Sequence, residues 1–239
     1  MGTPISSSSR LRVWDLPTRV FHWTLAAAFA FAFVSGESES GLTGHARAGF
    51  LILGLVAFRV VWGFAGTRYA RFAAFPLSPG KAIDYLRRLP TASRRHYVGH
   101  NPAASWAVVG LLSLVSATAI TGWRMQATGS EALEEIHEGL AIATLALVVL
   151  HIVGALVSSY YHRENLIGGM ITGWKKRSEG TETAGAEGSR WGVAVALGLA
   201  VLVFAVGWVP LPVSTDRAVD QGDRNRAGDH QQKQDEDDD

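Results

Sequence analysis

Long stretches of this chain carry no charge, and this feature restricts its fold more than any other. Residues 103–123 and 191–213 contain no Asp, Glu, Lys, Arg or His, and residues 139–161 contain only His151. A helix needs about 20 mostly apolar residues to cross the hydrocarbon layer of a membrane, and each segment reaches that length. The charged residues, 18% of the chain, collect between these segments. We therefore expect an integral membrane protein built from helices.

Two further segments complete the predicted bundle. Residues 48–66 are apolar apart from Arg59, and residues 20–35 form a shorter run, about 24 Å long as a helix. Asn101 followed by Pro102 predicts the start of the third span, because Asn caps helices and proline suits the first helical position. The expected fold is all-α, an integral membrane four-helix bundle plus a fifth C-terminal transmembrane helix. Its predicted parts are a cytoplasmic N-terminal arm (1–19), the four-span core (20–174), a polar linker (175–190), the fifth span (191–213) and an acidic, disordered tail (214–239).

Tryptophans lie near the ends of the predicted spans, where an amphipathic ring prefers the headgroup region of a bilayer. This placement supports the span limits and predicts that the rings face the membrane interface. The residues concerned are Trp14, Trp62, Trp106, Trp123, Trp174, Trp191 and Trp208.

The connecting segments predict the orientation of the chain, because cytoplasmic loops of membrane proteins are rich in Lys and Arg. The N-terminal arm and residues 67–100 carry many of these cations, whereas residues 36–46 carry none. The N-terminus is therefore predicted to be cytoplasmic and the tail extracytoplasmic. The alternative is that the first span is a cleaved signal peptide, but no clear small-x-small site closes its apolar run, and its removal would reverse the order of the loops.

The sequence contains no cysteine, and this limits its chemistry. Disulfides, iron–sulfur clusters, thiolate ligation of haem and covalent haem attachment through a C-x-x-C-H motif all need cysteine and are excluded. Any redox chemistry must then use a cofactor that is bound without a covalent bond. Imidazole is the best ligand that remains.

Four histidines lie at the ends of the predicted spans or inside them, where ionisable residues are rare and usually functional. His22 begins the first helix on the cytoplasmic side, whereas His45 and His137 begin the second and fourth helices on the outer side. His151 lies further along the fourth helix, towards the cytoplasm. Two histidines from different helices thus share each depth, which predicts an inner pair, His22 with His151, and an outer pair, His45 with His137. This pattern matches one bis-imidazole haem near each membrane face.

Helix phase supports this interpretation. His137 and His151 are 14 residues apart, so at about 100° per residue they lie on one helix face, about 21 Å apart along the axis. Arg59 has the same spacing from His45 and is predicted to lie at the depth of the inner pair, where its guanidinium suits a haem propionate. Three alternatives stay open: histidines that only cap helix ends, an Arg59 that reaches the cytoplasmic surface, and a zinc or metal-transport site. The last has no nearby Asp, Glu or Cys inside the membrane to complete its ligands.

The remaining four histidines carry weaker signals. His96 and His100 lie in the basic connection before the third span and are expected to face headgroups, with a place beside the inner pair as the alternative for His100. His162 follows the fourth span, where a cation suits the C-terminus of a helix. His230 lies in the predicted disordered tail.

The sequence resembles the bacterial cytochrome b-561 family, which includes the b-type subunits of membrane-bound nickel–iron hydrogenases. The resemblance covers about residues 12–174. It rests on four motifs: Val13-Trp14-Asp15-Leu16-Pro17-Thr18-Arg19-Val20-Phe21-His22-Trp23, Gly44-His45 with the later Arg59, His100-Asn101-Pro102, and His137-Glu138-Gly139 followed by His151. The resemblance implies two b haems in a four-helix bundle, with His22, His45, His137 and His151 as ligands. It also implies exchange of electrons with the membrane quinone pool and often with a partner redox protein.

The preferred function is electron transfer between quinone or quinol and an extracytoplasmic redox partner, such as a c-type cytochrome or a hydrogenase. Two imidazoles fill both axial positions of each iron, so we expect two low-spin, non-covalently bound haems that carry electrons. The cations Arg12, Arg19 and Arg59 are expected to raise the potential of the inner haem. No nucleic-acid partner is expected, and membrane lipid surrounds the spans.

Two other classes of function remain as alternatives. One is a stand-alone quinone-dependent oxidoreductase that acts on a small molecule such as superoxide. The other is a non-redox membrane transporter or scaffold. The acidic tail is expected to act as a solubilising end, with electrostatic steering of a basic redox protein as the alternative.

Overall fold

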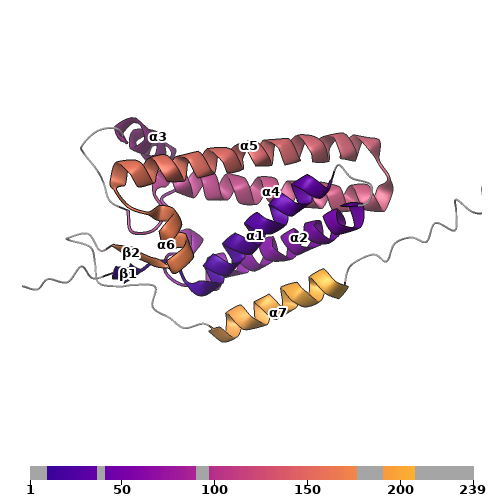
Figure 1. Ribbon diagram of the computed structural model, residues 1–239, viewed down its shortest axis with the longest axis horizontal. Coiled ribbons are helices and arrows are strands. Elements are labelled where there is room, and N and C mark those ends of the chain that lie inside the picture. Colours follow the sequence, from indigo (N-terminus) through magenta and orange to yellow (C-terminus); the bar gives the residue numbers. More distant parts are fainter. Residues whose placement is uncertain (1–9, 37–40, 90–96, 177–190, 208–239) are drawn as a thin grey trace, which may run out of the picture. The chain divides into compact units, whose positions relative to one another are not determined.

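Four long helices form the core of the computed structural model, which describes residues 10–36, 41–89, 97–176 and 191–207 (Figure 1). Each of the four is long and apolar enough to cross a membrane, which confirms the four predicted spans of the core. The chain divides into two compact units, Met1–Trp208 and Val209–Asp239, and all described residues belong to the first. The four helices are α1 (Leu16–Ser35), α2 (Leu42–Ala65), α4 (Pro102–Thr128) and α5 (Glu131–His162).

Helix α2 is the centre of the bundle, because it packs against both α1 and α4. Helix α5 packs along α4, and Figure 1 shows the two running side by side. The seam between α1, α2 and α4 is apolar and rich in small residues, which let membrane helices approach closely. Its buried members are Ala28, Ala32, Ala48, Ile52, Val56, Val115 and Ala119. Large apolar side chains such as Val34, Ile142 and Leu150 are exposed on the outside, as suits contact with lipid.

Polar caps rather than the limits of the apolar runs set the helix ends. Helix α1 starts at Leu16, before the predicted residue 20, because the Asp15 side chain accepts a hydrogen bond from the Thr18 backbone N–H at 2.7 Å. Helix α4 starts as predicted, with the Asn101 side chain accepting from the Ala104 N–H at 2.8 Å and Pro102 at the first position. An apolar run therefore predicts a span well and its ends less well.

A short two-stranded sheet joins the two ends of the four-helix core, a feature that the all-α expectation leaves out. Strand β1 (Arg10–Arg12) pairs antiparallel with β2 (Trp174–Lys176), which follows the short helix α6 (Leu166–Thr172). We call this pair of strands the clasp. Gly173 precedes β2 with φ at 89°, and its carbonyl accepts hydrogen bonds from the N–H groups of Val13 and Trp14 at 2.9 and 3.2 Å. The predicted N-terminal arm is thus partly built into the core.

A further helix, α3 (Pro79–Arg88), lies in the connection between α2 and α4, after a 3₁₀ turn, η2 (Phe72–Ala74). Tyr85 fixes α3 to the bundle. Its hydroxyl lies 3.0 Å from both Ser158 Oγ and His162 Nε2 on α5, and it accepts from Asn101 Nδ2 at 3.1 Å. Burial raises the pKa of Tyr85 above its usual value. One hydroxyl thereby joins α3, the start of α4 and the end of α5.

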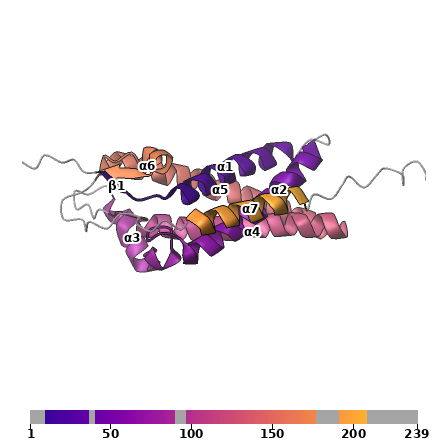
Figure 2. The same ribbon diagram turned by 90° about the horizontal axis from the view of Figure 1, so that it is seen from below.

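Helix α7 (Trp191–Gly207) is the described part of the predicted fifth span. Figures 1 and 2 both show it beside α2, against which it packs through the buried Ala194 and its neighbours Leu197 and Val201. Its apolar part is shorter than the four long helices. Residues 208–213, which would complete the span, lie outside the described residues, as do residues 177–190 of the predicted linker and the whole predicted tail. The fifth span therefore stays a prediction.

The tryptophans divide into two groups. Trp106, Trp123, Trp174 and Trp191 are between 42% and 46% exposed, as the predicted interfacial position requires. The prediction is wrong for Trp14 and Trp62, which are 8% and 1% exposed. Trp62 is buried because its indole N–H donates to Asp15 Oδ2 at 3.1 Å inside the protein. Trp208 lies outside the described residues.

Candidate functional site

The outer pair of histidines comes together in the structure. His45 lies in the first turn of α2, and His137 lies in the second turn of α5. Their ring centroids are 5.8 Å apart and their planes are 80° apart. The pairing predicted from depth thus corresponds to a direct approach of two imidazoles from different helices.

Both rings of the outer pair are oriented by backbone carbonyl groups. His45 Nδ1 lies 2.8 Å from the Ala32 carbonyl oxygen, and His137 Nδ1 lies 2.8 Å from the Thr118 carbonyl oxygen. A carbonyl oxygen only accepts, so each Nδ1 carries the proton and donates it. Each Nε2 then keeps its lone pair. Histidines that bind metals usually have this arrangement, because the bond to the carbonyl fixes the tautomer and the ring orientation.

The separation of the outer rings fits a bis-imidazole iron. If each imidazole nitrogen binds the metal at about 2 Å, the two ring centroids lie about 6 Å apart. The observed 5.8 Å agrees with this spacing. Within the described parts of the chain, no three His, Asp or Glu side chains gather in one place as a metal site. In these parts of the chain, the outer pair therefore offers an iron two imidazole ligands and no third side-chain ligand. This is the set of side chains that a haem iron requires.

Glycines make room for the outer rings. A Cβ atom on Gly122 of α4 would lie 2.8 Å from His137 Cε1 and 3.0 Å from its Nδ1, closer than side chains tolerate. A Cβ on Gly36 would lie 3.2 Å from His45 Nδ1. Sequence reasoning missed both residues. No signal in the sequence marks them, because their role depends on which helices become neighbours, and small residues in spans commonly serve only helix packing.

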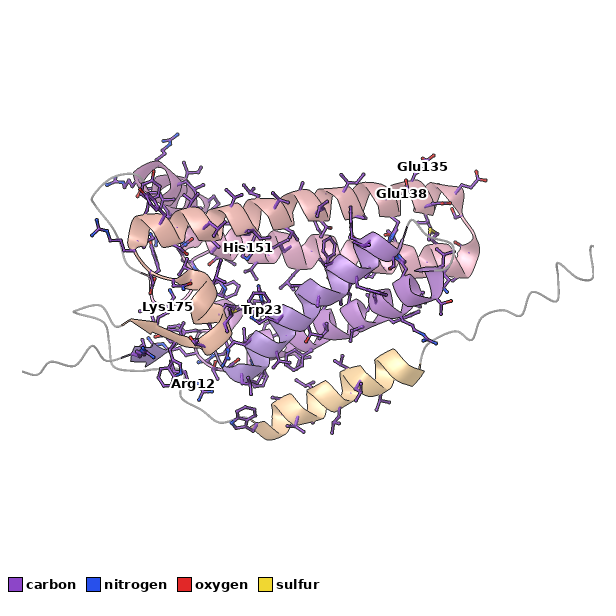
Figure 3. All side chains as sticks on the ribbon, in the orientation of Figure 1. Arg12, Trp23, Glu135, Glu138, His151 and Lys175 are labelled. Atoms are coloured by element: carbon purple, nitrogen blue, oxygen red, sulfur yellow. The ribbon has the colours of Figure 1, made fainter. Side chains whose placement is uncertain are left out.

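The inner pair comes from α1 and α5. His22 lies within electrostatic range of His151, and its ring also contacts Trp23, with the centroids 5.0 Å apart. Its Nδ1 is buried and has no hydrogen-bond partner among the described residues. In Figure 3, His151 lies well along α5 from Glu135 and Glu138, toward the clasp end of the bundle. The structure therefore brings His22 and His151 near each other, with a buried ring nitrogen available to a further group.

Arg59 is buried within electrostatic range of His100, which is itself within range of His151 of the inner pair. It is 3% exposed, so the alternative in which it reaches the surface is wrong. Its guanidinium carbon lies 4.7 Å from the ring centroid of Phe72 and 5.9 Å from that of Phe75. Its Nη1 is buried, and no residue in the part of the chain that the structure describes hydrogen-bonds to it. A buried guanidinium with an unsatisfied donor is costly unless an anion pairs with it, and a carboxylate matches its geometry.

His100 does not face headgroups as expected. Its ring packs against Trp14 and Phe75, with centroid distances of 4.7 and 4.5 Å, and its buried Nδ1 has no hydrogen-bond partner within the described ranges. The pKa of His100 is lowered to about 3, first by burial and then by the nearby charges of Arg59, Lys175 and His151. The alternative position beside the inner pair is therefore the one observed. His96 and His230 lie outside the described residues.

Charges of opposite sign mark the two ends of the bundle. Figure 3 shows Arg12 and Lys175 at the clasp end, and Glu135 and Glu138 at the other end. Lys175 pairs with Glu164 at 3.3 Å, and both side chains are largely buried. Burial lowers the pKa of Lys175, while Glu164 acts in the opposite direction. The cations thus gather at the end that holds Arg59 and His100.

Known proteins resemble this chain over most of its length. The family described as prokaryotic cytochrome b561 matches residues 13–173. A probable Ni/Fe-hydrogenase B-type cytochrome subunit of Rhodobacter capsulatus is 24% identical over 212 aligned residues, covering 67% of this chain and 79% of that protein. Proteins of the same description from Cupriavidus necator and Bradyrhizobium diazoefficiens are 25% and 23% identical, covering 68% and 67% of this chain and 86% and 84% of their own lengths. No solved structure matches the chain.

Proposed function

Because this chain belongs to the prokaryotic cytochrome b561 family, we propose that it is a di-haem membrane protein that carries electrons between quinone and an extracytoplasmic redox partner. Membership of the family makes it a multi-pass b-type cytochrome, with haem b as its cofactor and electron transfer as its activity. The observation that carries the finer proposal is the outer pair, in which two imidazoles lie 5.8 Å apart. Both rings also donate through Nδ1 to carbonyls and keep Nε2 for iron.

The proposed ligands are His45 with His137 for the outer haem and His22 with His151 for the inner haem. Each haem, when bound, supplies reversible one-electron oxidation and reduction of its iron. The four histidines would hold the two haems by two imidazoles each, and the haems would then supply electron transfer rather than a site for a substrate. The spacing of His137 and His151 along α5, about 21 Å by the helical rise, supports two separate haems rather than one.

Two side chains at the inner site are suited to a haem propionate. Arg59 presents the buried Nη1 and His100 the buried Nδ1, and neither atom has a hydrogen-bond partner in the described part of the chain. Arg59 belongs to α2, and His100 directly precedes Asn101, the N-cap residue of α4. A carboxylate between them would satisfy both donors and place a negative charge beside the guanidinium. The same positive charge favours the reduced haem, because reduction adds an electron to the site.

The relatives are described as subunits of a Ni/Fe hydrogenase. We infer for this chain a partner of the same kind, either a hydrogenase or a c-type cytochrome, on the extracytoplasmic side of a bacterial inner membrane. The cationic clasp end then faces the cytoplasm and the glutamate-rich end faces outward, in line with the positive-inside rule. In this orientation α7 belongs to a fifth span that leads to an extracytoplasmic tail.

An absorption spectrum of the purified protein tests the proposal. We expect sharp α-bands on reduction and two haems per chain. His22→Ala and His151→Ala should remove the same haem, and His45→Ala and His137→Ala should remove the other. A colourless protein refutes the proposal, and loss of the same haem in His22→Ala and His45→Ala refutes the pairing.

Stand-alone oxidation of superoxide is separated from this proposal by a different measurement. The purified cytochrome would then be reduced by superoxide, and would reduce quinone, without any partner protein. Reduction only through a partner supports electron transfer between proteins.

A further inference from the structure

Asp15 is a buried carboxyl group that the proposed electron transfer does not use. It is 6% exposed, and both of its oxygens accept hydrogen bonds. Oδ1 accepts from the Thr18 N–H at 2.7 Å, and Oδ2 accepts from Trp62 Nε1 at 3.1 Å and from Thr67 Oγ1 at 2.6 Å. The donors lie in the first turn of α1, the last turn of α2 and the segment after α2. One side chain therefore joins three segments at the clasp end.

These hydrogen bonds join the helices that carry two inner-site residues. His22 lies seven residues after Asp15, two turns along α1, and Arg59 lies three residues before Trp62, one turn back along α2. Apolar contacts make up most of the rest of the seam between α1 and α2, and near its other end a ring of the outer pair bonds to the backbone of α1. Apolar surfaces allow a close approach but restrict the sliding of one helix past the other less than directional bonds do. At the clasp end, the bonds of the buried carboxyl group supply this restriction.

Asp15 also contributes charge to the inner site. It lies within electrostatic range of Arg59. Its oxygens already accept from a backbone N–H, an indole N–H and a hydroxyl, whereas Arg59 Nη1 has no hydrogen-bond partner among the residues that the structure describes. The carboxyl group therefore acts on Arg59 from a distance and leaves that donor available.

We propose that Asp15 is a positioning residue of the inner haem site, which holds His22 and Arg59 at one depth and whose negative charge offsets part of the charge of Arg59. This inference rests on the proposed function for the inner haem. The hydrogen bonds on which it is built do not depend on that function. A positioning role and a charge role make different predictions, because some substitutions remove a bond without removing the charge.

The test uses three variants of the full-length, haem-loaded protein. Asp15→Asn keeps an oxygen acceptor for the Thr18 N–H but removes the negative charge and one acceptor. Thr67→Val and Trp62→Phe each remove one donor and keep the charge. The readouts are the midpoint potential of each haem and the electron paramagnetic resonance signals of the oxidised haems, which respond to the orientation of the axial imidazoles. Asp84→Asn is the matched control, because Asp84 is an exposed partner of Arg88 on α3.

We expect Asp15→Asn to raise the potential of the inner haem, since the loss of a nearby negative charge favours reduction. Thr67→Val and Trp62→Phe should alter the inner resonance signal with a smaller change of potential. The outer haem should keep its native values in all variants, and Asp84→Asn should change neither haem.

Unchanged inner potential and signals in Asp15→Asn would overturn the inference. If Asp15→Asn does not fold, unchanged inner signals in both Thr67→Val and Trp62→Phe overturn it. A native protein without an inner haem overturns the proposed function and this inference together. A native protein with two haems and unaffected variants rejects the role of Asp15 alone.

Discussion

Substitution of Gly122 by alanine tests the outer site through a residue that is not a ligand. The added Cβ would lie 2.8 Å from His137 Cε1, whereas ordinary contacts begin at 3.4 Å. The imidazole must therefore move by about half an ångström or more, because the backbone of α4 is held by its own hydrogen bonds and by packing against α5. The same movement lengthens the 2.8 Å bond from His137 Nδ1 to the Thr118 carbonyl.

The size of the effect follows from two opposing terms. Alanine is better than glycine inside a helix by about 1 kcal/mol, and overpacking of this kind costs about 1 to 3 kcal/mol. The bundle should therefore stay folded while His137 loses its alignment with His45. We expect the outer haem to be bound weakly or to become high-spin, with the inner haem retained.

Haem content, reduced spectra and electron paramagnetic resonance measure this outcome in the purified variant. Gly139→Ala is the control, because Gly139 lies two residues from His137 on α5 and a Cβ there meets no atom of the described residues within 4 Å. Two low-spin haems with native potentials in Gly122→Ala would refute the reasoning, since the outer rings would then not occupy the positions described.

Three further predictions concern charge. Arg59→Ala should lower the potential of the inner haem by on the order of tens of millivolts, because a buried cation is removed; an unchanged redox titration would reject this. Lys175→Met should destabilise the protein by about 3 kcal/mol, because it leaves the largely buried Glu164 unpaired; thermal unfolding in detergent measures the loss, which Glu164→Gln in the same chain should partly restore. Deletion of residues 219–239 should leave the reduction of a soluble partner unchanged at low salt, and slower reduction would instead show that the tail steers the partner.

Features that follow from the length and periodicity of single helices were predictable from the sequence. The four spans follow from apolar length, the start of α4 from Asn101 and Pro102, and the histidine pairs from depth and helix phase. These features depend on one helix at a time, or on the order in which helices cross the membrane. They need no knowledge of which helix faces touch.

The features that were missed depend on contacts between helices. Asp15 was visible as part of a motif, and its N-cap position before Leu16 could have been read from the sequence, but its bonds to Trp62 and Thr67 require α1 and α2 to be neighbours. Trp62 was expected to face headgroups because the sequence does not show that Asp15 lies beside it. His100 was expected to face headgroups because it lies in a basic loop. In the structure it packs against Trp14 and Phe75 inside the protein.

The clasp has a consequence for the order in which the protein is made. Strand β1 precedes the four helices of the core in the chain, whereas its partner β2 is synthesised only after all four. Until then, α1 can be held by its apolar contacts with α2 and by the bonds of Asp15, but not by the clasp. Closure of the clasp is therefore a late event in biogenesis. A chain truncated before Trp174 would leave strand β1 without its partner and therefore open to proteolysis. Sensitivity of β1 to a protease would then distinguish incomplete cores from complete ones.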